Sequence, residues 1–251
     1  MKKKKLAGVF LSLSLVAGAL AGCSGGDSKT SSSGGGSSKS GDTIKIGANL
    51  ELSGGTASFG QSAADGLKLA IDEINKEGID GKKLEIVKVD NKSDAAEATS
   101  GSIKLVSQDK VVAVVGSATS TNTLAQVQVA QDNKVPLLTP TATNPDITNK
   151  AGKLNDYVFR TCFIDPFQGT VAANFASDEI GAKTAAIYVD SASDYSKGLA
   201  AAFKEAFTAK GGKIVAEEAY VTKDTDFRST LTRIKSAKPE FVFLPGYYEE
   251  V

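Results

Sequence analysis

Short segments rich in hydroxyl side chains follow two apolar runs of the chain, and the first of these segments spans residues 116–122. Ser120 and Thr121 stand directly before a helical stretch, so one of them is expected to be its N-cap. A helix N-terminus also offers unpaired N–H groups and the positive end of its dipole to an anion. These residues therefore favour either simple capping or the binding of a ligand carboxylate.

The second hydroxyl-rich segment spans residues 139–145 and carries Thr141 and Thr143. Threonine before a proline such as Pro145 is ordinary turn chemistry. If the two segments lie side by side, the hydroxyl groups of Thr141 and Thr143 would complete a cradle for the same carboxylate. Both interpretations stay open on the residue pattern alone.

Aromatic residues at the ends of other segments add an apolar component, namely Phe59, Tyr195, Tyr247 and, as a weaker candidate, Tyr248. Their rings could close over the apolar side chain of a ligand. Aromatic rings at loop tips also cover the core of their own domain, and the pattern does not separate these two roles.

The composition excludes several classes of chemistry. The chain has no histidine and only two cysteines, which excludes a Ser-His-Asp or Cys-His arrangement and a histidine-ligated or cysteine-pair zinc site. Neither GxGxxG nor GxxxxGK[ST] occurs. Basic and acidic residues number 29 each, with no basic stripe, which argues against a nucleic-acid partner. The sequence thus predicts no catalytic residue, no metal site and no cofactor.

The amino terminus predicts export. Lys2–Lys5 precede an apolar stretch, Leu6–Leu20, that is too short to span a membrane comfortably, and Cys23 ends the sequence Leu-Ala-Gly-Cys. This ending resembles a bacterial lipobox, which implies cleavage before Cys23 and acylation of its thiol. Two acyl chains on one cysteine would anchor the protein stably at the extracytoplasmic face of the cell membrane.

Residues 24–41 are almost entirely Ser, Gly, Lys and Asp and are expected to form a flexible tether. The other cysteine, Cys162, is left without a disulfide partner and is expected to be a small buried apolar residue. We predict a signal peptide at 1–22, a tether at 23–42, a first domain at 43–163 and a second domain, incomplete in this chain, at 164–251.

From Thr43 onward, short apolar runs alternate strictly with stretches of helical periodicity. Unbroken apolar strands that alternate with helices predict an α/β fold with parallel sheets covered on both faces. Ligands bind beyond the carboxyl ends of such strands, where the hydroxyl-rich segments lie. The pattern predicts strands at 43–48, 84–89, 111–115, 135–138, 157–160, 184–189, 213–219 and 241–244, and helices at 59–78, 94–108, 121–133, 167–180, 195–210 and 227–236.

Several separate motifs, in order along the chain, resemble those of branched-chain amino acid binding proteins of ABC transporters. The spacing between the two hydroxyl-rich segments is also similar to that of this family. The resemblance covers residues 43–251 and rests on Ile44–Gly47, Leu52–Gly54, Phe59–Gly60, Ala70–Asn75, Gly78–Gly81, Val89–Asp94, 116–122, 139–145, Asp165–Gly169 and Gly246–Tyr248.

The resemblance implies a two-lobe periplasmic-binding-protein type I fold, each lobe a doubly wound parallel sheet. It implies that Ser120 holds the α-carboxylate of an amino acid, assisted by the backbone of Thr141 and by the backbone and side chain of Thr143. Ala118 and Thr119 would contact the ligand through their backbones. The residues that would line the pocket or close over it are Phe59, Tyr195 and Tyr247.

The resemblance further implies an ABC permease as partner and a branched-chain amino acid (Leu, Ile or Val) as ligand. The acidic residue that binds the α-ammonium in the family would lie beyond Val251, so residues 1–251 alone are expected to bind amino acids poorly. Two other functions stay open. The same fold could sense another small polar solute such as an amide, urea or another amino acid, and a doubly wound sheet could belong to an enzyme.

Overall fold

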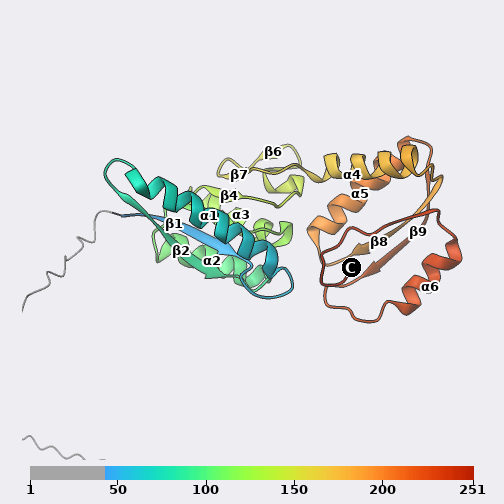
Figure 1. Cartoon of the computed structure of the whole chain (residues 1–251), viewed down its shortest axis with the longest axis horizontal. Helices are drawn as coiled ribbons and strands as arrows, with labels where there is room; N and C mark the ends of the chain where they lie inside the picture. Colours follow the sequence, from blue (N-terminus) through green and yellow to red (C-terminus); the bar gives the residue numbers. More distant parts are fainter. Residues whose placement is uncertain (1–42) are drawn as a thin grey trace, which may run out of the picture. The chain divides into compact units, whose positions relative to one another are not determined.

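A computed structural model describes residues 43–251. The predicted signal peptide, the tether and Cys23 lie outside the described residues. The described residues fall in one compact unit that contains two parallel sheets (Figure 1). The predicted boundary between residues 163 and 164 stays a prediction.

The first lobe is built on a five-stranded parallel sheet in the order β2-β1-β3-β4-β7. Its chain runs from strand to helix to strand, as the alternation of apolar runs predicts, with a short hairpin, β5–β6, near its end. The elements are β1 (Thr43–Leu50), α1 (Ala57–Glu77), β2 (Lys83–Asp90), α2 (Ala95–Ser107), β3 (Ala113–Gly116), α3 (Ser120–Asn133), β4 (Leu137–Thr139), the 3-10 turn η1 (Pro145–Ile147), β5 (Asn149–Lys150), β6 (Lys153–Leu154) and β7 (Val158–Arg160).

Helices cover both faces of this sheet. Ala48 and Leu50 of β1 pack against Ala64 of α1 on one face. On the other face Leu105 of α2 and Ala130 of α3 join a larger cluster with residues of β3, β4 and β7. Side chains alternate between the two faces of a strand, so a sheet with two apolar faces requires two helical layers. The predicted doubly wound arrangement is confirmed for this lobe.

The second lobe carries a three-stranded parallel sheet in the order β10-β8-β9. Stacked Phe203 and Phe207 of α5 are fully buried on one face, whereas Tyr188, Tyr220 and Ile234 pack on the other. Its elements are α4 (Asp165–Asn174), the π-turn η2 (Phe175–Glu179), β8 (Thr184–Asp190), α5 (Asp194–Ala209), β9 (Lys213–Tyr220), α6 (Arg228–Ala237) and β10 (Phe241–Phe243).

Three local expectations were wrong in detail. The helix expected at 167–180 begins at Asp165, because proline is well tolerated in a first turn and Pro166 lies there, and it changes into a π-turn at Phe175. The three-four spacing of Ala64, Leu67, Ile71 and Ile74 predicts one buried face of α1, yet Ile74 is 40% exposed. Cys162 is only partly buried rather than a core residue.

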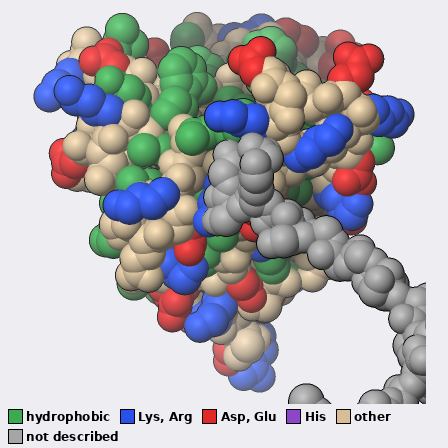
Figure 2. All heavy atoms as spheres, turned by 90° about the vertical axis from the view of Figure 1, so that its left-hand side faces the viewer, with side chains coloured by type: hydrophobic (Ala, Val, Ile, Leu, Met, Phe, Trp, Pro, Cys, Tyr) green, Lys and Arg blue, Asp and Glu red, His purple; other side chains and the backbone are tan. Residues whose placement is uncertain are grey.

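The surface mixes charge signs. On the face that Figure 2 shows, lysine and arginine side chains are interspersed with aspartate and glutamate, and hydrophobic side chains reach the surface between them. Among residues 43–251, no helix is long and apolar enough to cross a membrane.

Strand order fixes where loops diverge. In the first sheet the chain goes from β1 to β2 on one side and then crosses to β3 on the other, so the loops after β1 and β3 separate at the carboxyl edge. In the second sheet β8 is the central strand, and the loops after β8 and β10 separate in the same way. Such switch points are where open α/β sheets bind ligands.

Candidate functional site

A cavity of about 540 Å³ opens where the loops from both switch points meet. It contains seven of the eight residues predicted to contact a ligand, and only Thr119 is not part of its wall. Its lining consists of Phe59, Ser62, Ala63, Ala118, Ser120, Pro140, Thr141, Thr143, Phe163, Gln168, Tyr195, Gly246 and Tyr247.

The two hydroxyl-rich segments lie side by side because β3 and β4 are adjacent parallel strands, with Val114 and Val115 paired to Leu137 and Leu138. The segments that follow these strands therefore start at the same edge of the sheet. The Thr141 hydroxyl donates to the carbonyl oxygen of Ala118 at 2.7 Å and ties the segments together. The juxtaposition that would let both segments serve one ligand is present.

Ser120 is the first residue of α3, not its N-cap. The expectation that Ser120 or Thr121 caps the helix was wrong, because Thr119 occupies the N-cap position with an extended backbone. Ser120 is 1% exposed, and its Oγ accepts a hydrogen bond from the backbone N–H of Asn144 at 3.2 Å. Its hydroxyl proton is thereby left for another acceptor, and Ser120 lines the cavity.

Thr119 turns away from the cavity toward Glu51. Its backbone N–H and its hydroxyl both donate to Glu51 Oε1, at 3.1 and 2.7 Å. Sequence reasoning missed Glu51, because a charged residue just beyond a strand is ordinarily exposed. The available signal was its position: it directly follows β1, the neighbour of β3, and so lies next to the first hydroxyl-rich segment in the fold.

Thr143 connects the cavity with the start of α4. Its carbonyl oxygen accepts the backbone N–H of Asp165 at 3.0 Å. The Asp165 side chain is fully buried, and neither of its oxygens has a hydrogen-bond partner that meets standard geometry among the described residues. Burial raises the pKa of Asp165 to about 6, although Thr143 and the Arg160 guanidinium act in the opposite direction.

Aromatic rings form the other wall. Tyr195 and Tyr247 are stacked with ring centroids 5.2 Å apart, and Phe59 meets Tyr247 edge-on at 5.9 Å. Burial raises the pKa of both tyrosines above its usual value, so both stay protonated donors. Gln168, which sequence reasoning missed, donates to the Tyr195 hydroxyl at 3.2 Å.

Tyr248 plays a different part from Tyr247. It does not line the cavity; its hydroxyl accepts the backbone N–H of Ser58 at 3.1 Å, and its ring meets Phe59 edge-on at 5.1 Å. Tyr248 therefore lies against the beginning of α1.

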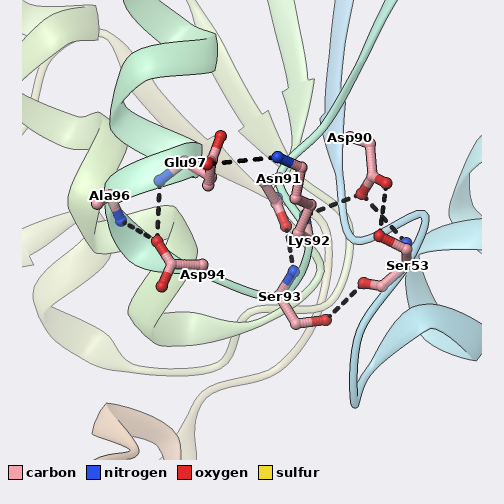
Figure 3. A network of polar contacts seen from close by, with 8 residues as sticks. All are labelled: Ser53, Asp90, Asn91, Lys92, Ser93, Asp94, Ala96 and Glu97. Carbon is pink, nitrogen blue, oxygen red and sulfur yellow. Dashed lines mark hydrogen bonds and ion pairs between the residues drawn. The ribbon is translucent and has the colours of Figure 1, made fainter.

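The loop between β1 and α1 is held by a network at the end of β2 (Figure 3). Asp90 accepts hydrogen bonds from the backbone N–H groups of Leu52 and Ser53 and from the Ser53 hydroxyl, the last at 2.6 Å. Burial opposes ionisation, but the hydrogen bonds from Ser53, Lys92 and Leu52 outweigh it and lower the pKa of Asp90. The network fixes the loop that leads to Phe59.

The backbone of Asp194, at the start of α5, joins the two lobes. Its N–H donates to the Thr121 hydroxyl at 2.9 Å, and its carbonyl oxygen accepts from the Asn144 side chain at 2.9 Å. Within residues 43–251, no cluster of three or more histidine, cysteine, aspartate or glutamate side chains is suited to hold a metal ion.

A sequence profile of the family described as "Periplasmic binding protein" matches residues 43–247. The chain belongs to this family. A curated relative, the "Leucine-, isoleucine-, valine-, threonine-, and alanine-binding protein" of Pseudomonas aeruginosa, is 34% identical over 211 residues, which are 84% of this chain and 55% of the relative. A Leu/Ile/Val-binding protein of Rhizobium johnstonii is 38% identical over 208 residues, 82% of this chain and 55% of the relative.

Solved structures of periplasmic binding proteins match the fold as well. The substrate-binding protein LivJ of Streptococcus pneumoniae, in complex with isoleucine, is 47% identical with a TM-score of 0.74, covering 82% of this chain and 57% of that chain. The leucine-binding protein LivK of Thermotoga maritima is 36% identical with a TM-score of 0.77 and the same coverage. The predicted family and the two-lobe type I fold are confirmed.

The chain spans about half the length of the curated relatives it matches. The relatives named above are binding proteins of an extracytoplasmic family, and the names of those relatives describe binding and not catalysis.

Proposed function

We propose that this protein captures a branched-chain amino acid outside the cytoplasm and delivers it to an ABC importer. The observation that carries the proposal is the make-up of one cavity, which joins the hydroxyl groups of Ser120 and Thr143 and the backbone of Thr141 to a wall of aromatic rings. Hydroxyl and N–H donors suit a carboxylate at one end, and rings suit an apolar side chain at the other.

The proposed roles combine the geometry of the cavity with the roles that the family resemblance implies. Ser120, at the first position of α3, donates its hydroxyl to the ligand carboxylate, where the helix dipole also favours negative charge. Thr143 adds its hydroxyl and N–H groups, and Thr141 its backbone. Phe59, Tyr195 and Tyr247 enclose the side chain. Ala118 contributes backbone surface. Thr119, which faces Glu51, supports the segment instead of touching the ligand.

The names of the relatives support this choice of ligand. The Pseudomonas aeruginosa relative is named for leucine, isoleucine, valine, threonine and alanine, and the Streptococcus pneumoniae structure holds isoleucine. The proposal involves no catalytic step and no cofactor; turnover of an amino acid by the purified protein would contradict it.

Thermal unfolding tests the ligand. The complete gene product, without residues 1–22 and with Cys23→Ser, is melted against each common amino acid. A ligand at 100 times its Kd stabilises the folded state by about 2.7 kcal/mol. We expect a rise in Tm with leucine, isoleucine and valine only. No shift with any amino acid would overturn the proposed ligand.

A pair of serine variants tests the site. Ser120→Ala removes the hydroxyl in the cavity wall, and Ser102→Ala removes that of a buried serine on α2, outside the wall. We expect calorimetry to show a loss of roughly 10-fold or more in leucine affinity for Ser120→Ala, because a hydrogen bond to a charged group contributes about 1.5–3 kcal/mol. Ser102→Ala should bind as the unaltered protein does.

A second ligand class, aromatic carboxylates, is favoured by structural neighbours that hold benzoates. A solute-binding protein of Rhodopseudomonas palustris in complex with 4-hydroxybenzoate is 31% identical with a TM-score of 0.71, covering 81% of this chain and 54% of that chain. An aromatic carboxylate would use the same hydroxyl groups and rings. A Tm rise with benzoates and none with amino acids would select it, and the same screen with amides and urea tests a sensor of other small polar solutes.

We also propose lipid anchoring at Cys23. In a bacterial host fed labelled palmitate, the unaltered protein should carry the label and sediment with membranes. Cys23→Ser should lose both properties, whereas Cys162→Ser should keep them. An unlabelled wild-type protein would contradict the anchor.

A further inference from the structure

Glu51 is a buried carboxylate whose hydrogen bonds all come from Ala118 and Thr119, just before α3, and from Asn122 in the first turn of α3. It is 0% exposed, and it takes part in none of the ion pairs found among residues 43–251. A buried ionised group needs strong compensation. Here the compensation comes from four donors: the backbone N–H groups of Ala118 (2.9 Å) and Thr119 (3.1 Å), the Thr119 hydroxyl (2.7 Å) and the Asn122 side-chain amide (3.0 Å).

The polar groups of Ala118 and Thr119, directly before Ser120, are all occupied by hydrogen bonds within the protein. The N–H of Ala118 goes to Glu51 and its carbonyl oxygen to the Thr141 hydroxyl. The N–H and hydroxyl of Thr119 go to Glu51, and its carbonyl oxygen accepts from Thr123. The segment therefore has one hydrogen-bonded arrangement, in which Ser120 is the first residue to present its side chain to the cavity.

A second layer of buried polar groups supports this arrangement. Asn122 also reaches Asn91 at 3.3 Å, and Asn91 donates to the Ser117 hydroxyl at 2.8 Å. Gln126 donates to the same hydroxyl, which itself donates to the carbonyl oxygen of Asn49. All five side chains are buried, so the network is protected from competition by water.

We infer that Glu51 is a positioning residue for ligand recognition, which fixes the 117–120 segment and confines the ligand carboxylate to Ser120 and Thr143. This inference rests on the proposed function. Without Glu51, the N–H groups of Ala118 and Thr119 at the start of α3 would be free to attract any anion. With Glu51 they are occupied by a group of the protein itself.

Calorimetry with leucine and leucinamide tests the role of Glu51. The protein is the complete gene product without residues 1–22 and with Cys23→Ser, alone and with Glu51→Gln. Glutamine keeps the shape, but its amide N–H₂ faces one of the donor groups. We expect roughly a 10- to 100-fold loss of leucine affinity, by analogy with the loss seen when a group that orients a metal ligand is removed. Leucinamide lacks the carboxylate, so its affinity should fall much less.

A matched variant separates positioning from general destabilisation. Asp190→Asn alters a carboxylate of the second lobe that is 2% exposed and accepts hydrogen bonds from Ala192 and Thr222 outside the cavity wall. It should lower the urea midpoint but leave the ratio of leucine to leucinamide affinity unchanged.

The possible outcomes distinguish the positioning role of Glu51 from the proposed function. Equal loss for leucine and leucinamide in Glu51→Gln, or no loss, overturns the positioning role while leaving the proposed function standing. No leucine binding by the unaltered protein overturns both. If Glu51→Gln does not fold, Thr119→Val provides the test, because it removes only the 2.7 Å hydroxyl contact to Glu51. It should lower leucine affinity several-fold, again more than leucinamide affinity, and an unchanged ratio would overturn the inference.

Discussion

Helices α3 and α5 both begin beside the cavity, but the residues at which the chain enters each helix are held in different ways. Before α3, Ala118 and the N-cap residue Thr119 donate to Glu51, which is 67–71 positions away in sequence from its hydrogen-bond partners, and Thr119 makes no side-chain capping bond. At α5 the acceptor is the N-cap residue itself, Ser193, whose Oγ receives the N–H of Ser196 at 3.2 Å. The first lobe thus holds its ligand-facing segment by tertiary contacts, whereas the second holds its segment by a local cap.

The carboxylates at the strand ends are used alike in the two lobes. Asp90 at the end of β2 accepts the N–H of Lys92 two residues later and hydrogen bonds from Ser53 in the loop after β1. Asp190 at the end of β8 receives Ala192 two residues later and Thr222 after β9. Residues held by contacts from distant parts of the chain are fixed only when the whole lobe has folded. A destabilising substitution in the first lobe should therefore disturb its ligand-facing segment more than one in the second lobe disturbs the start of α5.

The strongest test of this contrast is Gly60→Ala in α1. A Cβ at Gly60 would lie 2.1 Å from the carbonyl oxygen of Glu51, whereas a Cβ at Gly66 of the same helix would meet nothing within 4 Å. Because overpacking against a fixed backbone costs about 1–3 kcal/mol and occasionally more, we expect Gly60→Ala to unfold at much lower urea concentration and to lose leucine binding. Gly66→Ala should gain up to about 1 kcal/mol. Equal stability of the two variants would show that the loop after β1 moves freely.

Asp165 provides the next largest effect. Its pKa is about 6 in the folded protein and 3.8 as the unperturbed value, so between these pH values the folded state holds more protons than the unfolded state. Stability therefore falls as pH rises through this window, by up to about 3 kcal/mol, since one pKa unit corresponds to about 1.4 kcal/mol.

The measurement is the difference in unfolding free energy between the unaltered protein and Asp165→Asn from pH 3 to 8. Between about pH 4 and 6, the unfolding free energy of the unaltered protein should fall relative to that of Asp165→Asn. Outside this window the difference between the two proteins should stay constant. A difference independent of pH would mean that the buried carboxylate has an ordinary pKa.

Ser193→Ala measures the local cap of the second lobe. Loss of an N-cap hydroxyl costs about 1 kcal/mol. We expect a modest drop in urea midpoint without the preferential leucine loss expected for Glu51→Gln. If Ser193→Ala were as destabilising as Glu51→Gln, the contrast between the two helix starts would not hold.

Asp90→Asn should have the smallest effect. Because hydrogen bonds lower the pKa of Asp90, its contribution is fully present above its unperturbed pKa of 3.8 and is lost as pH falls through the lower folded value. The group is partly exposed, so the contribution is at most about 1 kcal/mol. Acid unfolding curves of the variant and the unaltered protein should converge as the pH falls below the unperturbed value, and a gap that widens there would contradict the assignment.

The alternation of strands and helices was predictable because parallel strands buried on both faces are continuous apolar runs, such as Ala185–Ile187 of β8. The neighbourhood of Ser120 and Thr143 was also predictable, since adjacent parallel strands end at one edge. The hairpin β5–β6 was not, because Asn149, Lys150 and Lys153 are exposed polar residues with no apolar periodicity.

The cap of α3 was misassigned for a related reason. Local rules favour a hydroxyl group immediately before a helix, and they assign Ser120 or Thr121 to that role. In the structure Thr119 takes the N-cap position, while its hydroxyl and N–H bind the buried carboxylate of Glu51 from another loop, and no local pattern reports such a residue. Gln168 was missed likewise, because only the packing of α4 beside α5 turns it toward Tyr195.

The Asp194 junction has a consequence for the lifetime of a bound molecule. Separation of the lobes must break the two hydrogen bonds that the backbone of Asp194 makes with Thr121 and Asn144. Because these bonds use the main chain, every non-proline residue at position 194 retains them. Besides the contact between Ser58 and Tyr248, the resistance to lobe separation thus depends on the side chains of Thr121 and Asn144. Substitutions at these two residues should shorten the residence time of the ligand, while those at position 194 leave it nearly constant.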